Sequence, residues 1–394
     1  MKILILTKLF PNEFSPVKGI FNKAFLDYFT KKEKISVTVI SPIPLFNDFK
    51  KKNNKIYFHP HKTEEKNYTI FYPRIFSFGK FFLGFHYYFY LKKIKKFILK
   101  NNINFDIIHS HWLYPDGFVG VKLAKSLNKK AIVHCHGSDI NFLLFDKRLT
   151  KQNYYTISNC DKLIVVSNAL KAKIISKYPE FENKIIVINN AIDCSNYDNL
   201  EYQDSLKKLN LLDDKIKKIV LVGNVCKSKG VFEILQAAKI LNEKKTNFKI
   251  YLIGKQYPNE IEFFKDFVTK NDLEDKIEFI GEVKPETIKY WFNIADFSLL
   301  PSHTEGFPLV IIESLASGTP VIASNVGGIP EIITIDEFGK IIESKNADQL
   351  ATAILEFLDK KKNSDLIKQK AKKFDMSIQA NKIMSEYITL INTN

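Results

Sequence analysis

Short runs of Ile, Val and Leu recur along the chain and alternate with longer segments whose apolar residues follow helical spacing. This alternation predicts βαβ units and a mainly parallel sheet. Strands that are apolar throughout, rather than at every second residue, predict a sheet covered by helices on both faces. The first series of predicted strands comprises Lys2–Leu6, Ser36–Ser41, Asp106–Ser110, Lys130–His134, Lys162–Val166 and Lys184–Ile188.

A second series of strands begins after a polar stretch, Asp193–Lys217, which we interpret as a linker. Its members are Lys218–Val222, Phe248–Ile253, Ile277–Ile280, Phe297–Leu300 and Val321–Ala323. We therefore predict an α/β protein with two doubly wound, Rossmann-like domains, residues 1–193 and 194–376, that face each other across a cleft. Ligands of such sheets bind beyond the carboxyl ends of the strands, so we expect the catalytic and binding residues in the loops that follow strands.

A glycine-containing loop, Gly223–Gly230, follows the first strand of the second series, and a helical pattern begins directly after it. Free backbone N–H groups and the helix dipole favour an anion at this point, and the ammonium of Lys229 would reach the same anion. The loop does not match the G-x-x-x-x-G-K-[ST] phosphate loop. An ordinary strand–helix turn with a solvated lysine is the alternative.

Two glutamates lie in the most informative segment, Glu305–Pro320. Pro308 suits the first turn of a helix, and Gly318 suits its end. Apolar residues surround Glu313 on that helix, so its carboxylate needs a polar partner to offset desolvation. A vicinal diol such as a ribose would supply two donors, and an ion pair with a lysine is the alternative. Glu305 precedes the helix, where stabilisation by the helix dipole is the alternative to a ligand contact.

The sequence E-G-F-P-L-V-I-I-E is an E-x7-E motif. Together with the following A-S-G-T-P-V-I-A-S, it closely resembles the retaining glycosyltransferases of family 4, which have the GT-B fold. Three further segments resemble that family's H-G-x-D, V-I-P-N-G-V-D and G-R-x-x-x-x-K-G motifs, in the same order: His136–Asp139, Val187–Asp193 and Gly223–Gly230. The resemblance implies that the first domain binds the acceptor, that the second binds a nucleotide sugar, and that a final helix, residues 377–394, crosses back to the first domain.

The resemblance also implies roles for individual residues. Glu313 would hold the ribose of the nucleotide-sugar donor, and Glu305 would contact its sugar. Lys229 would neutralise the diphosphate leaving group, and His136 would lie beside the donor sugar at the reacting centre. Further donor-binding positions would be Gly19, Asn224, Gly306, Phe307, Pro308 and Leu309. The implied reaction is hexosyl transfer with retention of configuration, without a cofactor and without an obligatory metal.

Two places depart from the family pattern. Asn224 stands where the family usually has arginine, so one phosphate-binding cation is missing. We expect Lys227 to substitute for it. Asn189 and Ala191 replace the usual proline and glycine of the interdomain segment, a change that we expect to alter the hinge little.

Two H-x-H pairs end predicted strands, and the residues of each pair point to one face of their strand. His109 and His134 are predicted to pack in the sheet, whereas His111 is predicted to line the cleft and His136 to act on the donor. With the nearby Asp116 and Asp139, the pairs would also suit a metal cluster. We expect no metal, because metallohydrolase motifs carry closer carboxylates.

Acceptor contacts are predicted in the segment W-L-Y-P-D-G that follows the first histidine pair. The residues concerned are Trp112, Tyr114 and Asp116. His303, just before Glu305, would either touch the donor or be a solvated loop histidine.

The net charge of +16 arises from 59 Lys+Arg against 43 Asp+Glu, but only Arg74 and Arg148 are arginines. Arginine makes the bidentate contacts that specific nucleic-acid readers favour, so we expect no nucleic-acid partner. The four cysteines contain no C-x-x-C pair, which is typical of a protein of the reducing cytosol. The apolar runs are too short for a signal peptide or a membrane span, so a cytoplasmic location is expected.

The segment from Phe76 to Asn101 combines an aromatic band with five lysines. Leu91, Ile94 and Ile98 repeat at helical spacing, which resembles a helix lying in a membrane interface. We hypothesise peripheral attachment to the inner face of the cytoplasmic membrane, where a polyprenyl-diphosphate-linked saccharide acceptor would be reached. The alternative is a helix that packs this stripe on the first domain while its lysines face water.

The function predicted from these observations is sugar transfer from a nucleotide sugar to a hydroxyl acceptor, in bacterial surface-polysaccharide biosynthesis. A nucleotide-sugar epimerase or a phosphorylase of the same fold is the alternative within enzymes. A non-catalytic polyanion-binding protein is the alternative outside them.

Overall fold

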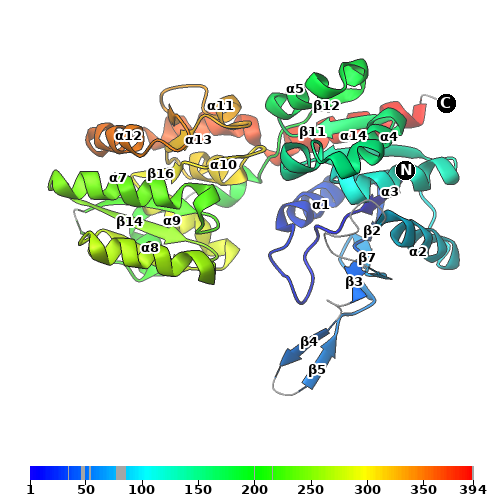
Figure 1. Ribbon diagram of the computed structural model, residues 1–394, viewed down its shortest axis with the longest axis horizontal. Helices are drawn as coiled ribbons and strands as arrows, with labels where there is room; N and C mark the ends of the chain where they lie inside the picture. The colour runs from blue at the N-terminus through cyan, green and yellow to red at the C-terminus, as the bar shows by residue number, and fades with distance from the viewer. Residues whose placement is uncertain are drawn as a thin grey trace. The chain divides into compact units, whose positions relative to one another are not determined.

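The computed structural model describes residues 1–33, 35–45, 49–52, 55–76, 86–198, 200–214 and 216–392. The chain forms two compact units (Figure 1). The first consists of Met1–Asn189 and Gln379–Asn394, and the second of Asn190–Ile378. The division therefore falls a few residues before the predicted boundary at Asp193. The whole of the predicted linker belongs to the second unit, and it contains α6 (Tyr202–Leu209).

The first unit is built on an eight-stranded sheet of order β12-β11-β10-β9-β1-β2-β7-β6. Neighbouring strands run parallel, except β6 and β7. The strands are β1 Lys2–Leu6, β2 Ser36–Ile40, β6 Lys62–Glu64, β7 Tyr68–Phe71, β9 Ile107–His111, β10 Lys130–Cys135, β11 Lys162–Val165 and β12 Ile185–Val187. Two small pairs lie outside this sheet: β3 Ile43–Pro44 with β8 Arg74–Ile75, and β4 Phe49–Lys52 with β5 Lys55–Phe58.

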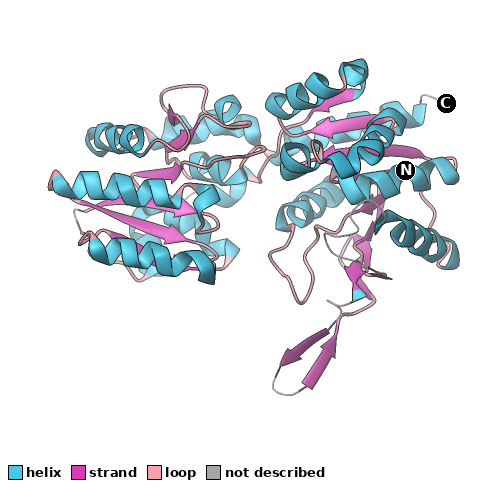
Figure 2. Ribbon diagram, viewed as in Figure 1, coloured by secondary structure: helices cyan, strands magenta, loops and turns pink. Residues whose placement is uncertain are grey.

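Helices cover both faces of this sheet (Figure 2). They are α1 Ile20–Lys32, α2 His86–Lys100, α3 Phe118–Ser126, α4 Thr150–Asn159, α5 Asn168–Lys177 and the part of α14 (Met376–Asn392) from Gln379 onward. Ile3 and Ile5 of β1 share one apolar cluster with Phe29 of α1 and with Ile383 and Tyr387 of α14. The C-terminal helix is therefore part of the core of the first unit.

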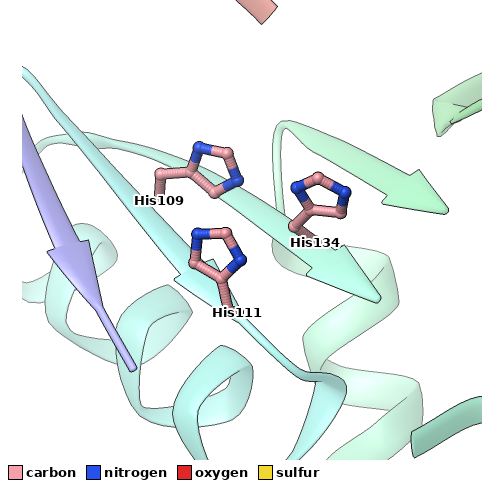
Figure 3. A group of neighbouring side chains, drawn as sticks. All are labelled: His109, His111 and His134. Carbon is pink, nitrogen blue, oxygen red and sulfur yellow. The ribbon is translucent and has the colours of Figure 1, made fainter. Parts of the chain in front are cut away.

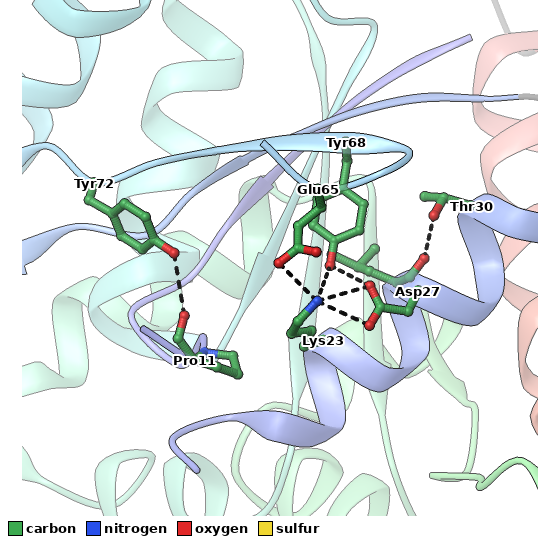
Figure 4. A network of polar contacts seen from close by, with 8 residues as sticks. Pro11, Lys23, Asp27, Thr30, Glu65, Tyr68 and Tyr72 are labelled. Carbon is green, nitrogen blue, oxygen red and sulfur yellow. Dashed lines mark hydrogen bonds and ion pairs between the residues drawn. The ribbon is translucent and has the colours of Figure 1, made fainter. Parts of the chain in front are cut away.

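A polar network joins α1 to β7, a strand that the sequence analysis missed (Figure 4). The ammonium of Lys23 lies 3.1 Å from the carboxylate of Asp27 and 3.0 Å from that of Glu65. The hydroxyl of Tyr68 donates to Asp27 at 2.6 Å. These bonds fix α1 against β7, the strand next to β2 in the sheet.

The second unit contains a fully parallel six-stranded sheet of order β15-β14-β13-β16-β17-β18. The strands are β13 Lys217–Val222, β14 Phe248–Ile253, β15 Ile277–Gly281, β16 Phe297–Leu300, β17 Val321–Ser324 and β18 Gly339–Ile342. In both units, every predicted strand is present with its ends within one residue of the prediction. The strand order reverses between β13 and β16, and ligands of doubly wound sheets bind at such a point.

Alternate residues of β13 face opposite helix layers. Ile219 and Leu221 pack with α7 and α12, whereas Val220 and Val222 pack with α6 and α9. The helices of this unit, besides α6, are α7 Val231–Glu243, α8 Pro258–Lys270, α9 Ile288–Ile294, α10 Leu309–Ala316, α11 Ile329–Ile332, α12 Ala347–Asp359 and α13 Ser364–Ala371. The continuous apolar strands thus follow from burial on both faces.

None of the helices among the described residues has both the length and the apolar character needed to cross a membrane. All four cysteines are buried and free. Within α2, the buried stripe is Tyr90, Ile94 and Ile98. Leu91, which we had placed in that stripe, is only half-buried, and residues 77–85 of the predicted aromatic band lie outside the described residues.

Candidate functional site

The switch point of the second unit brings Lys229 and Glu305 together. Lys229 ends a short helical turn after β13, and Glu305 lies in the loop after β16. The ammonium nitrogen of Lys229 is 2.5 Å from Oε1 of Glu305, and the hydroxyl of Ser302 donates to the same oxygen at 2.8 Å. Their side chains are 26% and 10% exposed. The residues predicted to bind phosphate and sugar therefore form one ion pair.

Glycine allows the two loops to approach this closely. Gly230 has φ 74°, and a Cβ atom there would lie 2.0 Å from the carbonyl oxygen of Pro301. The N–H of His303 donates to the carbonyl of Ser228 at 2.9 Å, which ties the loop of Lys229 to the loop of Glu305. A side chain at position 230 would separate the loops and hence the ion pair.

A hydrogen-bonded pair of His303 and Glu233 lies beside this ion pair. Nε2 of His303 is 2.8 Å from Oε1 of Glu233, whose side chain is 10% exposed. Asn224 is exposed in the loop, and the ammonium of Lys227 lies over the ring of Phe263 of α8. The expectation that Lys227 replaces the family arginine therefore stays a prediction.

Glu313 lies on α10, and its side-chain partner is the hydroxyl of Tyr197. Burial raises the pKa of the Glu313 carboxyl to about 7, although the hydrogen bond from Tyr197 acts in the opposite direction. Burial, and next the charge of Glu313, raise the pKa of Tyr197, so its hydroxyl remains the donor. Tyr197 lies in the stretch that we had interpreted as a linker, and nothing in that polar sequence marked it.

The backbone between the two glutamates is fixed from several sides. The carbonyl of Gly306 accepts the N–H of Gly328 at 2.9 Å, and the carbonyl of Phe307 accepts the side-chain amide of Asn190 at 3.0 Å. The ring of Phe307 is buried against Phe374. Pro308 then caps α10, which begins at Leu309. The loop is thus held rigidly at the start of the helix that carries Glu313.

In the first unit, Gly19 and His136 belong to neighbouring loops. Gly19 precedes α1 with φ 66°, and a Cβ atom there would lie 2.3 Å from the carbonyl oxygen of Leu9. The ring of Phe21, two residues later, meets the ring of His136 edge-on, with centroids 5.1 Å apart. The turn at Gly19 thus leads into a helix whose Phe21 contacts a predicted site residue, His136.

Four histidines form a stacked row along β9 and β10, three of which are drawn in Figure 3. His134 pairs with His111 in the sheet register, so both H-x-H pairs face the same side. The rings of His109 and His111 are 4.8 Å apart and nearly parallel, and those of His134 and His136 are 4.5 Å apart. His111 had been expected to line a cleft, but it is only 5% exposed.

Hydrogen bonds tie the histidine row to its surroundings. The hydroxyl of Tyr387, from α14, lies 2.6 Å from Nδ1 of His109. Nδ1 of His111 lies 2.8 Å from Nε2 of His136. Burial lowers the pKa of His111 to about 3 and lowers the pKa values of the other three well below the ordinary range. The four rings are therefore neutral at physiological pH.

The stacking of the row does not favour a metal ion. Ring nitrogens of His109, His111 and His134 lie within 4.8 Å of one another, so their separation alone would allow a shared ion. The first two rings are within 7° of parallel, so their in-plane lone pairs do not converge. That the reaction needs no metal stays a prediction.

Two carboxylates of the first unit are buried and hydrogen-bonded. Asp116 is 2% exposed and accepts the N–H of Lys8 at 2.7 Å and the hydroxyl of Tyr90 at 2.8 Å. Asp139 is fully buried and accepts three backbone N–H groups, those of Gly137, Leu113 and His136, at 2.9 to 3.1 Å. Burial raises the pKa of both carboxyls, whereas these hydrogen bonds lower it.

The predicted acceptor residues differ in accessibility. Tyr114 and Asp116 are buried, whereas Trp112 is half-buried with φ 81°. Contact of these residues with an acceptor stays a prediction.

Two family models match the chain in sequence order. The model of Glycosyltransferase Family 4 matches residues 31–196, and that of Glycosyl transferases group 1 matches residues 203–374. An uncharacterised glycosyltransferase of Methanocaldococcus jannaschii is 30% identical over 75% of this chain and 77% of its own length. TuaC of Bacillus subtilis, a glycosyltransferase assigned to teichuronic acid biosynthesis, is 25% identical over the full length of both chains.

Solved structures agree in fold. Sucrose-phosphate synthase of Thermosynechococcus elongatus superposes with a TM-score of 0.82 at 19% identity, over the full length of both chains. Anabaena HepE, solved with UDP and glucose, gives a TM-score of 0.75 at 15% identity over 99% of this chain and all of its own. The family matches, the relatives and the two Rossmann-like sheets lead to one conclusion: the chain is a glycosyltransferase, a member of family 4 with the GT-B fold.

Proposed function

We propose that this enzyme transfers a sugar from a nucleoside diphosphate sugar to a hydroxyl acceptor, with retention of anomeric configuration. The observation that carries the proposal is the Lys229–Glu305 ion pair at the switch point, followed on the same segment by the half-buried Glu313. The solved complex of Anabaena HepE with UDP and glucose supports a nucleotide-sugar donor for a protein of this fold.

Charge governs the chemistry of the donor site. The diphosphate departs with two negative charges, and a preorganised cation stabilises the charge that develops there. Lys229 supplies that cation when the diphosphate replaces Glu305 as its partner. Glu305 is then free to accept a hydroxyl of the sugar, and Glu313 accepts the ribose hydroxyls.

Retention follows from a front-face route, in which the departing phosphate takes the proton of the attacking acceptor hydroxyl. The protein then needs neither a carboxylate nucleophile nor a metal, and no cofactor takes part. Transfer that continues at an unchanged rate in excess chelator is the expected result. Loss of activity in the chelator, restored by one divalent cation, would contradict this part of the proposal.

A thermal-shift screen of nucleotides and nucleotide sugars tests the donor proposal, because ligands that prefer the native state raise its melting temperature. We expect one nucleoside diphosphate and its sugar derivative to stabilise the protein most. NMR of the product formed with that donor then reads the anomeric configuration. A new sugar isomer formed without acceptor would indicate an epimerase, and a strict need for inorganic phosphate would indicate a phosphorylase.

The acceptor is proposed to be a polyprenyl-diphosphate-linked saccharide of surface-polysaccharide biosynthesis, reached at an anionic membrane surface. Helix α2 supports this idea, because it carries five lysines and no acidic residue. Its solvent face also exposes Tyr88, Phe89 and Leu99. Apolar side chains among lysines are typical of helices that lie in a membrane interface.

Vesicle sedimentation tests the membrane contact. We expect binding to vesicles with anionic lipid at low salt, and loss of binding when Lys92, Lys96 and Lys100 are replaced by glutamine. A control variant carries the same replacements at Lys207, Lys208 and Lys244 of the second unit, which are equally exposed. If both variants bind equally well, α2 is not the contact surface.

A further inference from the structure

The hydrogen bond between His111 and His136 sets the proton positions on both rings. Nδ1 of His111 and Nε2 of His136 are 2.8 Å apart. Both rings are neutral, so each carries one proton and only one of the two bonded nitrogens can be the donor. The choice of donor therefore decides the tautomer of His136.

Burial favours one tautomer. Nδ1 of His136 is buried and has no partner among the described residues, whereas Nε2 of His111 is not among the buried unpartnered atoms. A buried N–H without an acceptor is rarer in native proteins than an acceptor that lacks a donor. The proton of His136 therefore belongs on Nε2, where it is donated to His111, and Nδ1 carries a bare lone pair.

The surroundings leave the ring of His136 little freedom. The backbone N–H of His136 donates to the buried carboxylate of Asp139 at 3.1 Å. Its ring stacks on those of His111 and His134 and meets Phe21 edge-on. The bond to His111 is thus the only polar contact that the described residues make with the ring.

We propose that His111 is a positioning residue, which accepts the Nε2–H of His136 and so fixes the tautomer and the orientation of the His136 ring beside the donor sugar. The placement of a sugar beside this ring rests on the proposed function. A neutral ring held at this place adds no charge near the departing diphosphate.

Two variants of His111 separate the hydrogen bond from the ring. His111→Asn places an amide oxygen near the position of Nδ1 and retains an acceptor, whereas His111→Phe retains a stacking ring without one. We expect His111→Phe to lower kcat about tenfold, which corresponds to the free energy of one hydrogen bond. The dissociation constant of the donor nucleotide should stay unchanged. His111→Asn is expected to stay within about threefold of the wild type.

Tyr387→Phe is the matched control. It removes the bond to His109 in the same buried row but leaves the His111–His136 bond intact. We expect a lower melting temperature and unchanged kcat. If Tyr387→Phe and His111→Phe lower kcat equally, the row has only a structural role and the proposal fails.

Long-range ¹H–¹⁵N NMR of histidine-labelled protein reads the tautomers without any substrate. The expected spectrum shows a protonated Nε2 and a bare Nδ1 for His136, and a mixture of tautomers in His111→Phe. A protonated Nδ1 in the wild type would overturn the assignment, as would stoichiometric metal that is lost in His111→Phe. Absence of sugar transfer by the wild type would instead remove the proposed function and leave the tautomer result standing.

Discussion

The two units use the same architectural position in opposite ways. Each has a doubly wound sheet with polar residues in the loops at its carboxyl edge. In the second unit these residues are charged and partly accessible, as in the pair of Lys229 with Glu305. In the first unit they are neutral or fully buried, as in the histidine row and Asp139. The carboxyl edge of the second unit therefore carries accessible charges, whereas that of the first unit carries buried groups with fixed hydrogen bonds.

Replacement of Lys229 by alanine tests the charged carboxyl edge of the second unit. It should have the largest effect on kcat. Loss of one preorganised donor to a developing anion costs on the order of 10²–10³ in kcat. The fold should persist, because the removed charge is partly exposed. Steady-state kinetics and circular dichroism are the measurements.

A control for this variant is Lys249→Ala, which breaks the half-exposed pair with Glu278 in the same unit. It should leave kcat within twofold. Wild-type activity in Lys229→Ala would refute the role assigned to this lysine.

Replacement of Asp139 by asparagine tests the buried carboxyl edge of the first unit. The buried carboxylate accepts three backbone N–H groups, and an amide must turn its own donors toward some of them. We expect the free energy of unfolding to fall by about 3 kcal/mol, measured by urea denaturation. Activity should fall in parallel with stability at high temperature, and a variant with normal stability would show that this edge is not rigid.

Glu313→Gln separates ligand binding from stability. A carboxyl whose folded pKa is about 7 binds its proton more tightly in the folded than in the unfolded state. Unfolding free energy should therefore fall as pH rises from about 4.5 to about 7, by on the order of 2 kcal/mol. Donor affinity should rise over the upper part of the same range, because the carboxylate is the better acceptor for ribose hydroxyls.

The glutamine variant should lose both pH dependences. It should be more stable than the wild type at pH 8 and should bind the donor nucleotide more weakly there. Melting curves and calorimetric titration at several pH values check both signs. Donor affinity that does not change between pH 6 and 8 in the wild type would contradict the role of this carboxyl.

Tyr197→Phe should have the smallest effect of these variants, a shift in the pH dependence of donor affinity. The hydroxyl of Tyr197 lowers the pKa of Glu313, so its removal should move the midpoint of the pH-dependent donor affinity upward. We expect a shift of less than about one pH unit, the scale of a single hydrogen bond. A downward shift would show that the ring of Tyr197, rather than its hydroxyl, sets the environment of Glu313.

The fold was predictable where strands are buried on both faces. Their continuous apolar sequences stand out from the polar segments around them, and those strands were placed within one residue. The strands that were missed are short or lie toward sheet edges, such as β7 and β18. Their stability depends on partners distant in sequence, for example the bond from Tyr68 to Asp27.

The candidate site was predictable only where a motif is contiguous. The loops of Lys229 and Glu305 were found from their sequences, but their ion pair depends on the neighbouring positions of β13 and β16. The His111–His136 bond depends on the register between β9 and β10. The contact of Tyr197 with Glu313 was not predicted, because a tyrosine in a polar segment does not indicate which helix it packs against.

The division of the chain also bears on the order in which it folds during synthesis. The second unit is one continuous segment, whereas the core of the first includes Ala380, Ile383, Tyr387 and Leu390 near the C-terminus. Domains generally complete folding from the N-terminal end as the ribosome proceeds. Here the unit that begins the chain must wait for the last turns of α14 to leave the ribosome, whereas the unit translated second can finish first.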